Sequence, residues 1–440
     1  MHLTGSMPAS KLQFRASGSE YVLDAVAVLS ATLIFVDISL VGRLYVSEIL
    51  LAALFPILFF TKSHLLLKTV IVKLAVLASI WLAVQVLTDI YRGTPFVDYA
   101  RGWAKISMLL VNLLCLTMLL LGNVRRLRLF ALGLGIGGIL AYFFNPSEYT
   151  AADFWKFGIG YPTTLTCVVF LTFLRSPRRL SAPIVLLALS MLNLYMGARS
   201  LSGVCFVAGI YLFARPYLAD RQSRALKLSA RSIMFSVIIV LGAGYGALYT
   251  YEYAVRDGLL GENARIKYEQ QNAGDFGYLV GGRLTDAIMA AGAIYDSPFI
   301  GYGSWAKSDD FFSIGENLNG YGYTLYMKPY YDSGLIPSHS HLLGAWVEAG
   351  IVGAVFWLFV MNIIVRTLIS HEVITHPLFP LITYIGLLFA WDILLSPFGA
   401  DRHLTTAFYL VLLLSTGVQP KRLIPALKQR RPALAGNDYT

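Results

Sequence analysis

The sequence has few charged residues and only three cysteines. Charged residues make up 14% of its 440 residues and hydrophobic residues 57%, whereas a soluble domain carries about 25% charged residues. Cys115, Cys167 and Cys205 all lie in long apolar runs, so neither a disulfide framework nor a zinc site is expected. The low charged fraction excludes a soluble domain, and the three cysteines within apolar runs exclude a disulfide-linked scaffold.

No cleavable signal peptide, internal repeat or acidic cluster is evident in the sequence. Its amino-terminal residues 1–20 are polar, and no small-residue cleavage site follows the first apolar run, so we expect no cleavable signal peptide. One long polar segment occurs only in the second half, which argues against two related halves. No acidic pair or triad stands out as a divalent-metal site, so we expect no metal and no other cofactor.

Long apolar runs separated by charged gaps dominate the chain. Each approaches the roughly 20 residues that a helix needs to cross a membrane, and each is continuously apolar, which favours helices over a barrel. The sequence therefore predicts an all-α, polytopic integral membrane bundle of about 12 transmembrane helices. The predicted spans are about 21–41, 45–60, 69–89, 104–122, 129–144, 161–174, 182–198, 201–214, 233–249, 342–366, 379–395 and 404–417.

Lysine and arginine are concentrated in the loops that share a side with the amino terminus. The positive-inside rule then places both termini in the cytoplasm and the long polar segment outside. The net charge of +10 is explained by topology and by contact with anionic lipids, so no nucleic-acid partner is expected. The predicted organisation is a tail at 1–20, nine helices within 21–249, a large outer segment at 250–341, three helices within 342–417 and a basic tail at 418–440.

His339 lies in a polar stretch that passes directly into an apolar run carrying Glu348. Histidine changes charge near neutral pH and suits proton transfer, and a glutamate inside lipid needs a partner or a function. Glu348 fits equally well a carboxylate that packs between helices. His341 lies in the same stretch, so chemistry alone leaves it as a rival base.

An amphipathic helix is predicted from Arg283 to the Ser297-Pro298 pair, where proline disfavours continuation. The turn after it, from Pro298 to Gly303, carries glycines that permit close backbone approach to a ligand. The predicted apolar stripe of this helix contains Leu284, Ile288, Ala291 and Tyr295.

Several other charged residues lie in or beside the apolar runs. Arg199 is flanked by small residues between two runs and needs an anionic partner, which an interfacial arginine also finds in a lipid headgroup. Asp37 and Asp392 are candidate functional carboxylates inside predicted spans, whereas Glu48 and Asp89 lie near span ends, where we expect them to face headgroups.

The pattern His-Ser-x-Leu-Leu-x4-Glu-x-Gly-x2-Gly from His339 to Gly353 resembles the signature of the O-antigen ligase and polysaccharide polymerase superfamily of bacterial inner-membrane glycosyltransferases. The arginine-led helix with its Pro-x2-Gly-x-Gly turn resembles the same superfamily, and Arg199 matches its small-residue-flanked arginine at the outer end of a middle span. The resemblance implies a GT-C-like fold with the active site facing the periplasm.

The resemblance further implies a metal-independent, inverting transfer of a glycan from a polyprenyl (undecaprenyl) diphosphate donor to an acceptor sugar hydroxyl. His339 is the implied base, Glu348 is expected to hold a ring nitrogen or an arginine, and Arg199 and Arg283 are expected to bind the diphosphate. Surface polysaccharide polymerase is slightly preferred, and a ligase that acts on lipid A core is the alternative. A transporter or flippase for lipid-linked oligosaccharides is the rival from another class, and the lack of related halves weighs against it.

Overall fold

The structure, a computed structural model, describes residues 18–39, 41–173, 180–220, 249, 252–258, 265, 281–311 and 334–417, without the side chains of residues 19, 152, 217–220 and 281–285. Apart from one pair of short strands, the regular elements of these residues are helices. In chain order the main elements are α1 (Gly18–Thr32), β1 (Asp37–Ser39), β2 (Arg43–Tyr45), α2 (Val46–Lys62), α3 (Thr69–Arg92), α4 (Phe96–Leu120), α5 (Val124–Phe144), α6 (Glu148–Ala152), α7 (Gly160–Leu171), α8 (Ser181–Tyr195), α9 (Arg199–Asp220), α12 (Gly281–Asp296), α15 (His341–Ile369), α16 (Glu372–Thr375), α17 (Phe379–Leu395) and α18 (His403–Leu414).

Several of these helices are long and apolar enough to cross a membrane, judged by length and composition. Within the described residues there are five: Val46–Leu65, Thr69–Arg92, Phe96–Leu120, Val124–Phe144 and His341–Ile369. They confirm the predicted class of an all-α membrane protein. The predicted ninth run, 233–249, lies outside the described residues except for Tyr249, and each other run overlaps one described helix. The count of 12 spans therefore stays a prediction.

The first predicted run, 21–41, is helical only in part, which corrects the sequence prediction. α1 ends at Thr32, and β1 and β2 then pair as an antiparallel hairpin with Asp37 opposite Tyr45. The strand pairing satisfies the backbone polar groups of residues 37–39 and 43–45, which have left the helix. Asp37 therefore lies in a hairpin, where its carboxylate is 3.8 Å from the Arg43 guanidinium, and not inside a membrane helix.

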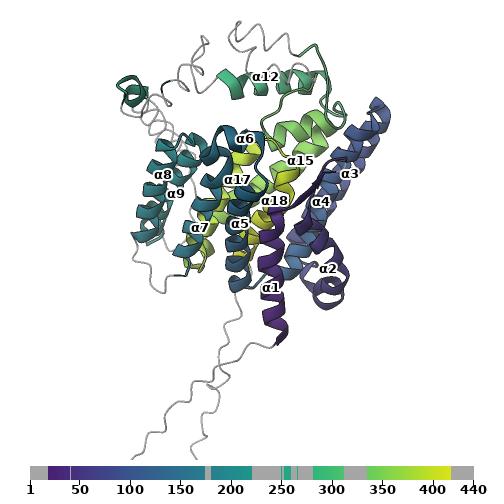
Figure 1. Ribbon diagram of the computed structural model, residues 1–440. Coiled ribbons are helices and arrows are strands. Elements are labelled where there is room, and N and C mark those ends of the chain that lie inside the picture. The colour runs from purple at the N-terminus through teal and green to yellow at the C-terminus, as the bar shows by residue number, and fades with distance from the viewer. Residues whose placement is uncertain are drawn as a thin grey trace, which may run out of the picture.

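Contacts between helix ends define two ends of the bundle. We call the end where α3 finishes and α4 and α15 begin the site end, because Lys105 of α4 meets Glu348 of α15 there. We call the end where α1 and α5 begin the opposite end, because Arg126 of α5 meets Asp24 of α1 there. Figure 1 shows α12 lying across the site end, above α15.

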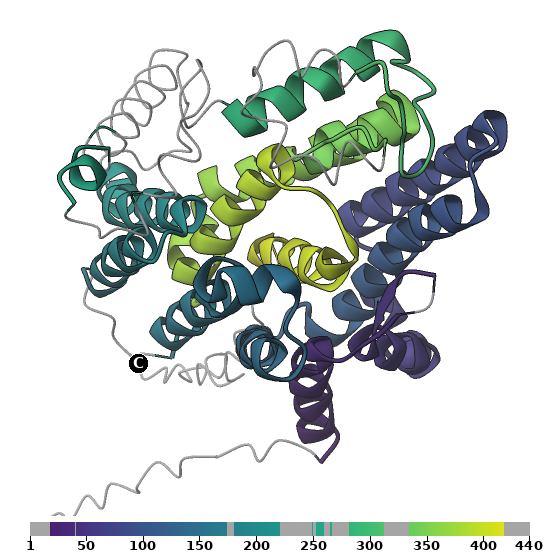
Figure 2. The ribbon, with the colours of Figure 1, turned by 45° about the horizontal axis from the view of Figure 1, so that its top comes forward.

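α18 lies in the middle of the bundle, with other helices around it (Figure 2). Almost all of its side chains are buried, as expected for a helix that is hydrophobic all round. Its Phe408 stacks on Phe130 of α5 with ring centroids 4.9 Å apart, and Tyr409 packs against Phe389 of α17 at 5.5 Å. The core thus joins the first and last thirds of the chain.

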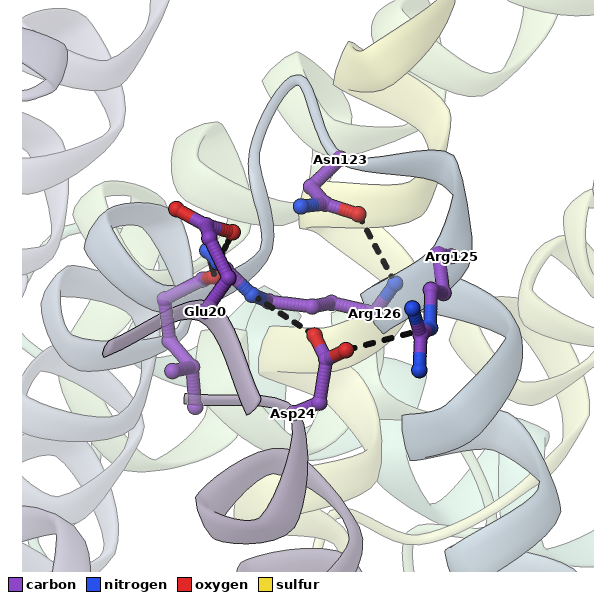
Figure 3. Close-up of polar contacts among 6 residues, drawn as sticks. Glu20, Asp24, Asn123, Arg125 and Arg126 are labelled. Carbon is purple, nitrogen blue, oxygen red and sulfur yellow. Dashed lines mark hydrogen bonds and ion pairs between the residues drawn. The ribbon is translucent and has the colours of Figure 1, made fainter. Parts of the chain in front are cut away.

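A buried charge cluster at the opposite end fixes α1 to α5 (Figure 3). The Arg126 guanidinium, with 3% of its side chain exposed, contacts Glu20 and donates to Asp24 at 3.1 Å. Arg125 reaches the second oxygen of Asp24, also at 3.1 Å, and the Asn123 side chain caps α5 by accepting from the Arg126 amide at 3.0 Å. Asp24 therefore has a structural partner inside the protein.

Arg126→Met is expected to lower the free energy of unfolding by about 3 kcal/mol, because it leaves a buried carboxylate short of its partner. Arg125→Met is the matched control: 58% of the Arg125 side chain is exposed, so its loss should cost about 0–1 kcal/mol. Thermal unfolding in detergent measures both variants. Equal losses would contradict the assignment of Arg126 as the anchor.

Candidate active site at one end of the bundle

α15 is broken near its start. Ala349 and Gly350 have non-helical dihedral angles, with φ 63° and ψ −161° at Gly350. The predicted span at 342–366 is therefore two helical pieces, and Glu348 lies at the end of the first. The break leaves backbone groups of α15 open to partners outside the helix.

The loop that follows α12 fills this break. Tyr302 and Gly303 donate their amides to the carbonyls of Val347 and Glu348 at 2.8 and 3.0 Å, and the Pro298 carbonyl accepts from Ile351 at 2.9 Å. A Cβ on Gly350 would lie 2.0 Å from the Phe299 carbonyl oxygen. The glycines of the Pro-x2-Gly-x-Gly turn were predicted to let the backbone approach a ligand; here they let it approach α15 itself.

The same loop is anchored to the end of α3. Asp89, which is 2% exposed, accepts from the amide and hydroxyl of Ser304 at 2.6 and 2.7 Å and from the Trp103 indole at 2.7 Å. Arg92 donates to the Gly301 carbonyl at 2.9 Å. Burial and a hydrogen bond to Asp296 raise the pKa of Tyr302 to about 12, so this loop hydroxyl stays protonated.

The expectation that Asp89 and Glu48 face headgroups is wrong. Asp89 holds the loop, and Glu48 is buried at 1% exposure, where it accepts from Asn112 at 2.8 Å and lies 3.2 Å from His403. Both carboxylates have found polar partners on other elements, which is what their burial requires.

His339 lies at the site end, in contact with a carboxylate from α12. Its Nδ1 atom meets Oδ2 of Asp286; 31% of the His339 side chain is exposed and 3% of the Asp286 side chain. The histidine loop is fixed on both sides, because Ile336 donates to the Ala306 carbonyl at 2.9 Å and Ser340 donates to the Ile393 carbonyl at 2.8 Å. An imidazole that is partly open to solvent and backed by a buried carboxylate is suited to proton transfer.

Sequence reasoning missed Asp286 because it chose the wrong stripe of α12. The helix runs from Gly281 to Asp296, close to its predicted limits, but its most buried residues are Asp286, Met289, Ala290 and Ala293, whereas Tyr295 is 90% exposed. The alanines of the buried face gave a weak hydrophobic signal, and the larger Leu284, Ile288 and Tyr295 of the predicted stripe gave a stronger one. The usable signal was a lone aspartate in line with three apolar residues.

His341, the rival base, is enclosed. Its side chain is 1% exposed, Nδ1 lies 2.6 Å from the Ser396 carbonyl oxygen, and its ring packs against Trp357 and Phe398 with centroids 4.8 and 5.2 Å away. A substrate cannot reach such a ring without opening the core, so His339 is the more accessible of the two histidines.

Glu348 pairs with Lys105 of α4, which corrects the expectation of a histidine or arginine partner. Both side chains are 15% exposed. The pair could not be predicted from the sequence, because Lys105 of α4 and Glu348 are 243 residues apart. A lysine against this carboxylate ties α4 to the broken start of α15.

Lys105→Met should destabilise the protein by about 2–3 kcal/mol, because it leaves Glu348 largely buried and without its charge partner. The double variant Lys105→Met, Glu348→Gln should recover at least half of that loss, since a neutral amide costs less to bury. Thermal unfolding of the two single variants and the double variant measures the coupling, and strictly additive losses would argue against the pair.

Arg199 and Arg283 differ in how far the structure places them. The Arg199 guanidinium atoms Nε and Nη1 are buried at the start of α9. The other half of α9 meets the end of α15, where Tyr211 and Arg215 donate to the carbonyls of Leu368 and Ile369; Arg199 therefore lies toward the site end. Arg283 is in the first turn of α12, and its side chain lies outside the described part of the structure.

A further arginine, which sequence reasoning left without a role, pairs with Asp392. Arg402 donates to Asp392 at 2.7 Å in the turn between α17 and α18. Burial favours the neutral form of this guanidinium, but the carboxylates of Asp392 and Asp401 more than offset it and raise the pKa of Arg402. The candidate carboxylate Asp392 therefore holds a permanent cation at the site end.

No protein-family model and no curated protein sequence matches this chain. The fold and site together define an all-α membrane protein that carries a cluster of paired ionisable side chains at one end of its helical bundle.

Proposed function

We propose that the protein is a membrane glycosyltransferase of the O-antigen ligase and polysaccharide polymerase type. It would transfer a glycan from a polyprenyl (undecaprenyl) diphosphate donor to an acceptor sugar hydroxyl at the periplasmic face of a bacterial inner membrane. The observation that carries the proposal is the partly exposed His339 imidazole, set against a buried carboxylate at the end of a membrane bundle, within the sequence signature of that superfamily.

The chemistry asks for one base and for cations. Neutral His339 takes the acceptor hydroxyl proton, which is typically worth about 10²–10⁴ in rate. The diphosphate leaving group carries its own negative charge, and arginine matches its oxygens with paired N–H donors. Arg199 and Arg283 are the proposed diphosphate ligands, and a prenyl chain between helices explains why the enzyme is a membrane protein.

In vitro transfer from a defined undecaprenyl-diphosphate oligosaccharide, with the purified protein in nanodiscs, tests the proposal. Longer lipid-linked chains would identify a polymerase, which we prefer, and a glycan attached to lipid A core would identify a ligase. If neither product forms with a range of donors, the glycosyltransferase proposal fails.

The break in α15 is one feature that favours the rival function, transport of lipid-linked oligosaccharides, because transporters bind substrates at discontinuous helices. However, the break lies close to the site end and is filled by the loop from Pro298 to Gly303. Donor flipping in proteoliposomes, measured without acceptor, would favour transport instead.

Arg283→Lys is expected to lose most transfer activity, because a lysine keeps the charge but not the paired donor geometry. Steady-state rates at saturating acceptor, with donor concentration varied, measure the effect, which should appear largely as weaker donor use. Unchanged donor binding would contradict the diphosphate role. Arg92→Lys is unsuitable as a control, because Arg92 holds the loop after α12.

A further inference from the structure

We infer that Asp286 is a positioning residue that fixes the tautomer and orientation of His339. This inference rests on the proposed function. The carboxylate contacts Nδ1 and leaves Nε2 as the nitrogen that acts on the acceptor.

The charges around the site end support this assignment. Among the described residues, Lys105 pairs with Glu348, Arg402 with Asp392 and Lys307 with Asp98 at 2.8 Å. The carboxylate that faces the imidazole comes from α12 and is almost fully buried. The contact with the imidazole is made through Nδ1, so Nδ1 is the ring nitrogen that faces the negative charge.

The contact determines which nitrogen can act as the base. An ionised carboxylate only accepts hydrogen bonds, so the proton of neutral imidazole resides on Nδ1 and the lone pair on Nε2. The acceptor hydroxyl proton then moves to Nε2 while its oxygen bonds the anomeric carbon. The bond from that carbon to the diphosphate oxygen breaks, and its electron pair leaves with the diphosphate. Asp286 stabilises the resulting imidazolium until its proton passes to water.

Both members of the pair are held by separate, fixed elements. α12 presents Asp286 from the same buried face as Met289 and Ala293. The loop carrying His339 is attached to Ala306 on one side and to α17 on the other. Their relative orientation is thus set before any substrate binds, as efficient catalysis requires.

Asp286→Asn removes the charge and keeps the shape, and Asp257→Asn is the control, because it makes the same substitution at an exposed carboxylate away from α12 and its loop. Two readouts are measured on each purified protein: transfer kinetics across pH, and the rate at which diethyl pyrocarbonate modifies His339, followed by mass spectrometry of its peptide. The second readout needs no glycan. It reports the neutral imidazole, and the enclosed His341 should react little.

Asp286→Asn should lower kcat about 10- to 100-fold with little change in the KM for donor, because a misoriented base loses part of the roughly 10²–10⁴ that general base catalysis contributes. The pH dependence of His339 modification should differ from that of the wild-type protein, because the substitution removes the negative charge that faces Nδ1. Asp286→Glu should recover part of both effects, and Asp257→Asn should show neither.

The inference is overturned if Asp286→Asn keeps the wild-type kcat and the wild-type pH dependence of His339 modification. A general folding defect would lower kcat and the unfolding temperature while the pH dependence of His339 modification stayed unchanged. That outcome too would overturn the inference. If the wild-type protein shows no transfer, the proposed function fails, while the modification profile still decides whether Asp286 acts on His339.

Discussion

His339→Ala should reduce glycan transfer by about 100-fold or more, because the proposed base is lost while the positioning and charge of the site remain. The unfolding temperature should fall only modestly: Asp286 loses its imidazole contact, but the His339 side chain is 31% exposed and its loop is held by backbone and Ser340 contacts. Initial rates per mole of folded protein, with accumulation checked by size-exclusion chromatography, give the result.

His341→Ala is the matched control, and the two variants should differ in stability. Removing a ring enclosed by Trp357 and Phe398 opens a cavity, which should cost about 2 kcal/mol or more. His339→Ala should therefore lose nearly all activity with a small loss of stability, whereas His341→Ala should show the larger loss of stability. Wild-type transfer by His339→Ala would end its assignment as the base.

The helices were predictable from sequence because their signal is local. Continuous apolar runs predicted α2, α3, α4, α8 and α9, and Pro298 predicted the end of α12. Apolar length and breakers act within a few residues of where they occur. The class of the protein followed from these features alone.

The polar pairs were not predictable, because each joins residues far apart in the chain. Glu348 and Lys105 are 243 residues apart in the sequence. Asp286 contacts His339 from a face of α12 whose burial depends on the segments that pack against it, so the sequence of α12 alone did not identify that face. Sequence spacing placed His339 at a candidate site. Spacing did not identify the carboxylate that faces His339. The apolar run also led to the wrong prediction that Asp37 lies in a membrane helix, whereas it lies in the β1–β2 hairpin.

The break in α15 also escaped the sequence prediction, since Gly350 lies in a run whose hydropathy is that of an ordinary span. The break depends on a second segment: a Cβ on Gly301 would lie 2.6 Å from the Gly350 amide nitrogen, so two glycines from distant segments permit the contact together. The loop and the break are therefore one structure, which brings α12 and Asp286 to the start of α15.

Gly350→Ala should consequently disrupt the site more than its size suggests. The new Cβ would lie 2.0 Å from the Phe299 carbonyl oxygen, at a residue with φ +63°, and ψ −161° makes that conformation essentially one for glycine alone. We expect a loss of about 3 kcal/mol or more in unfolding free energy, or failure to accumulate. Thermal unfolding and the yield of monodisperse protein measure it.

Gly203→Ala is the matched control, because it makes the same substitution in α9 where a Cβ meets nothing within 4 Å. It should be neutral or stabilise the helix by up to about 1 kcal/mol. If Gly350→Ala proved as harmless as Gly203→Ala, the loop after α12 would not depend on the break. α12 would then lose its fixed attachment to α15, and with it the reason why Asp286 and His339 meet in a defined orientation.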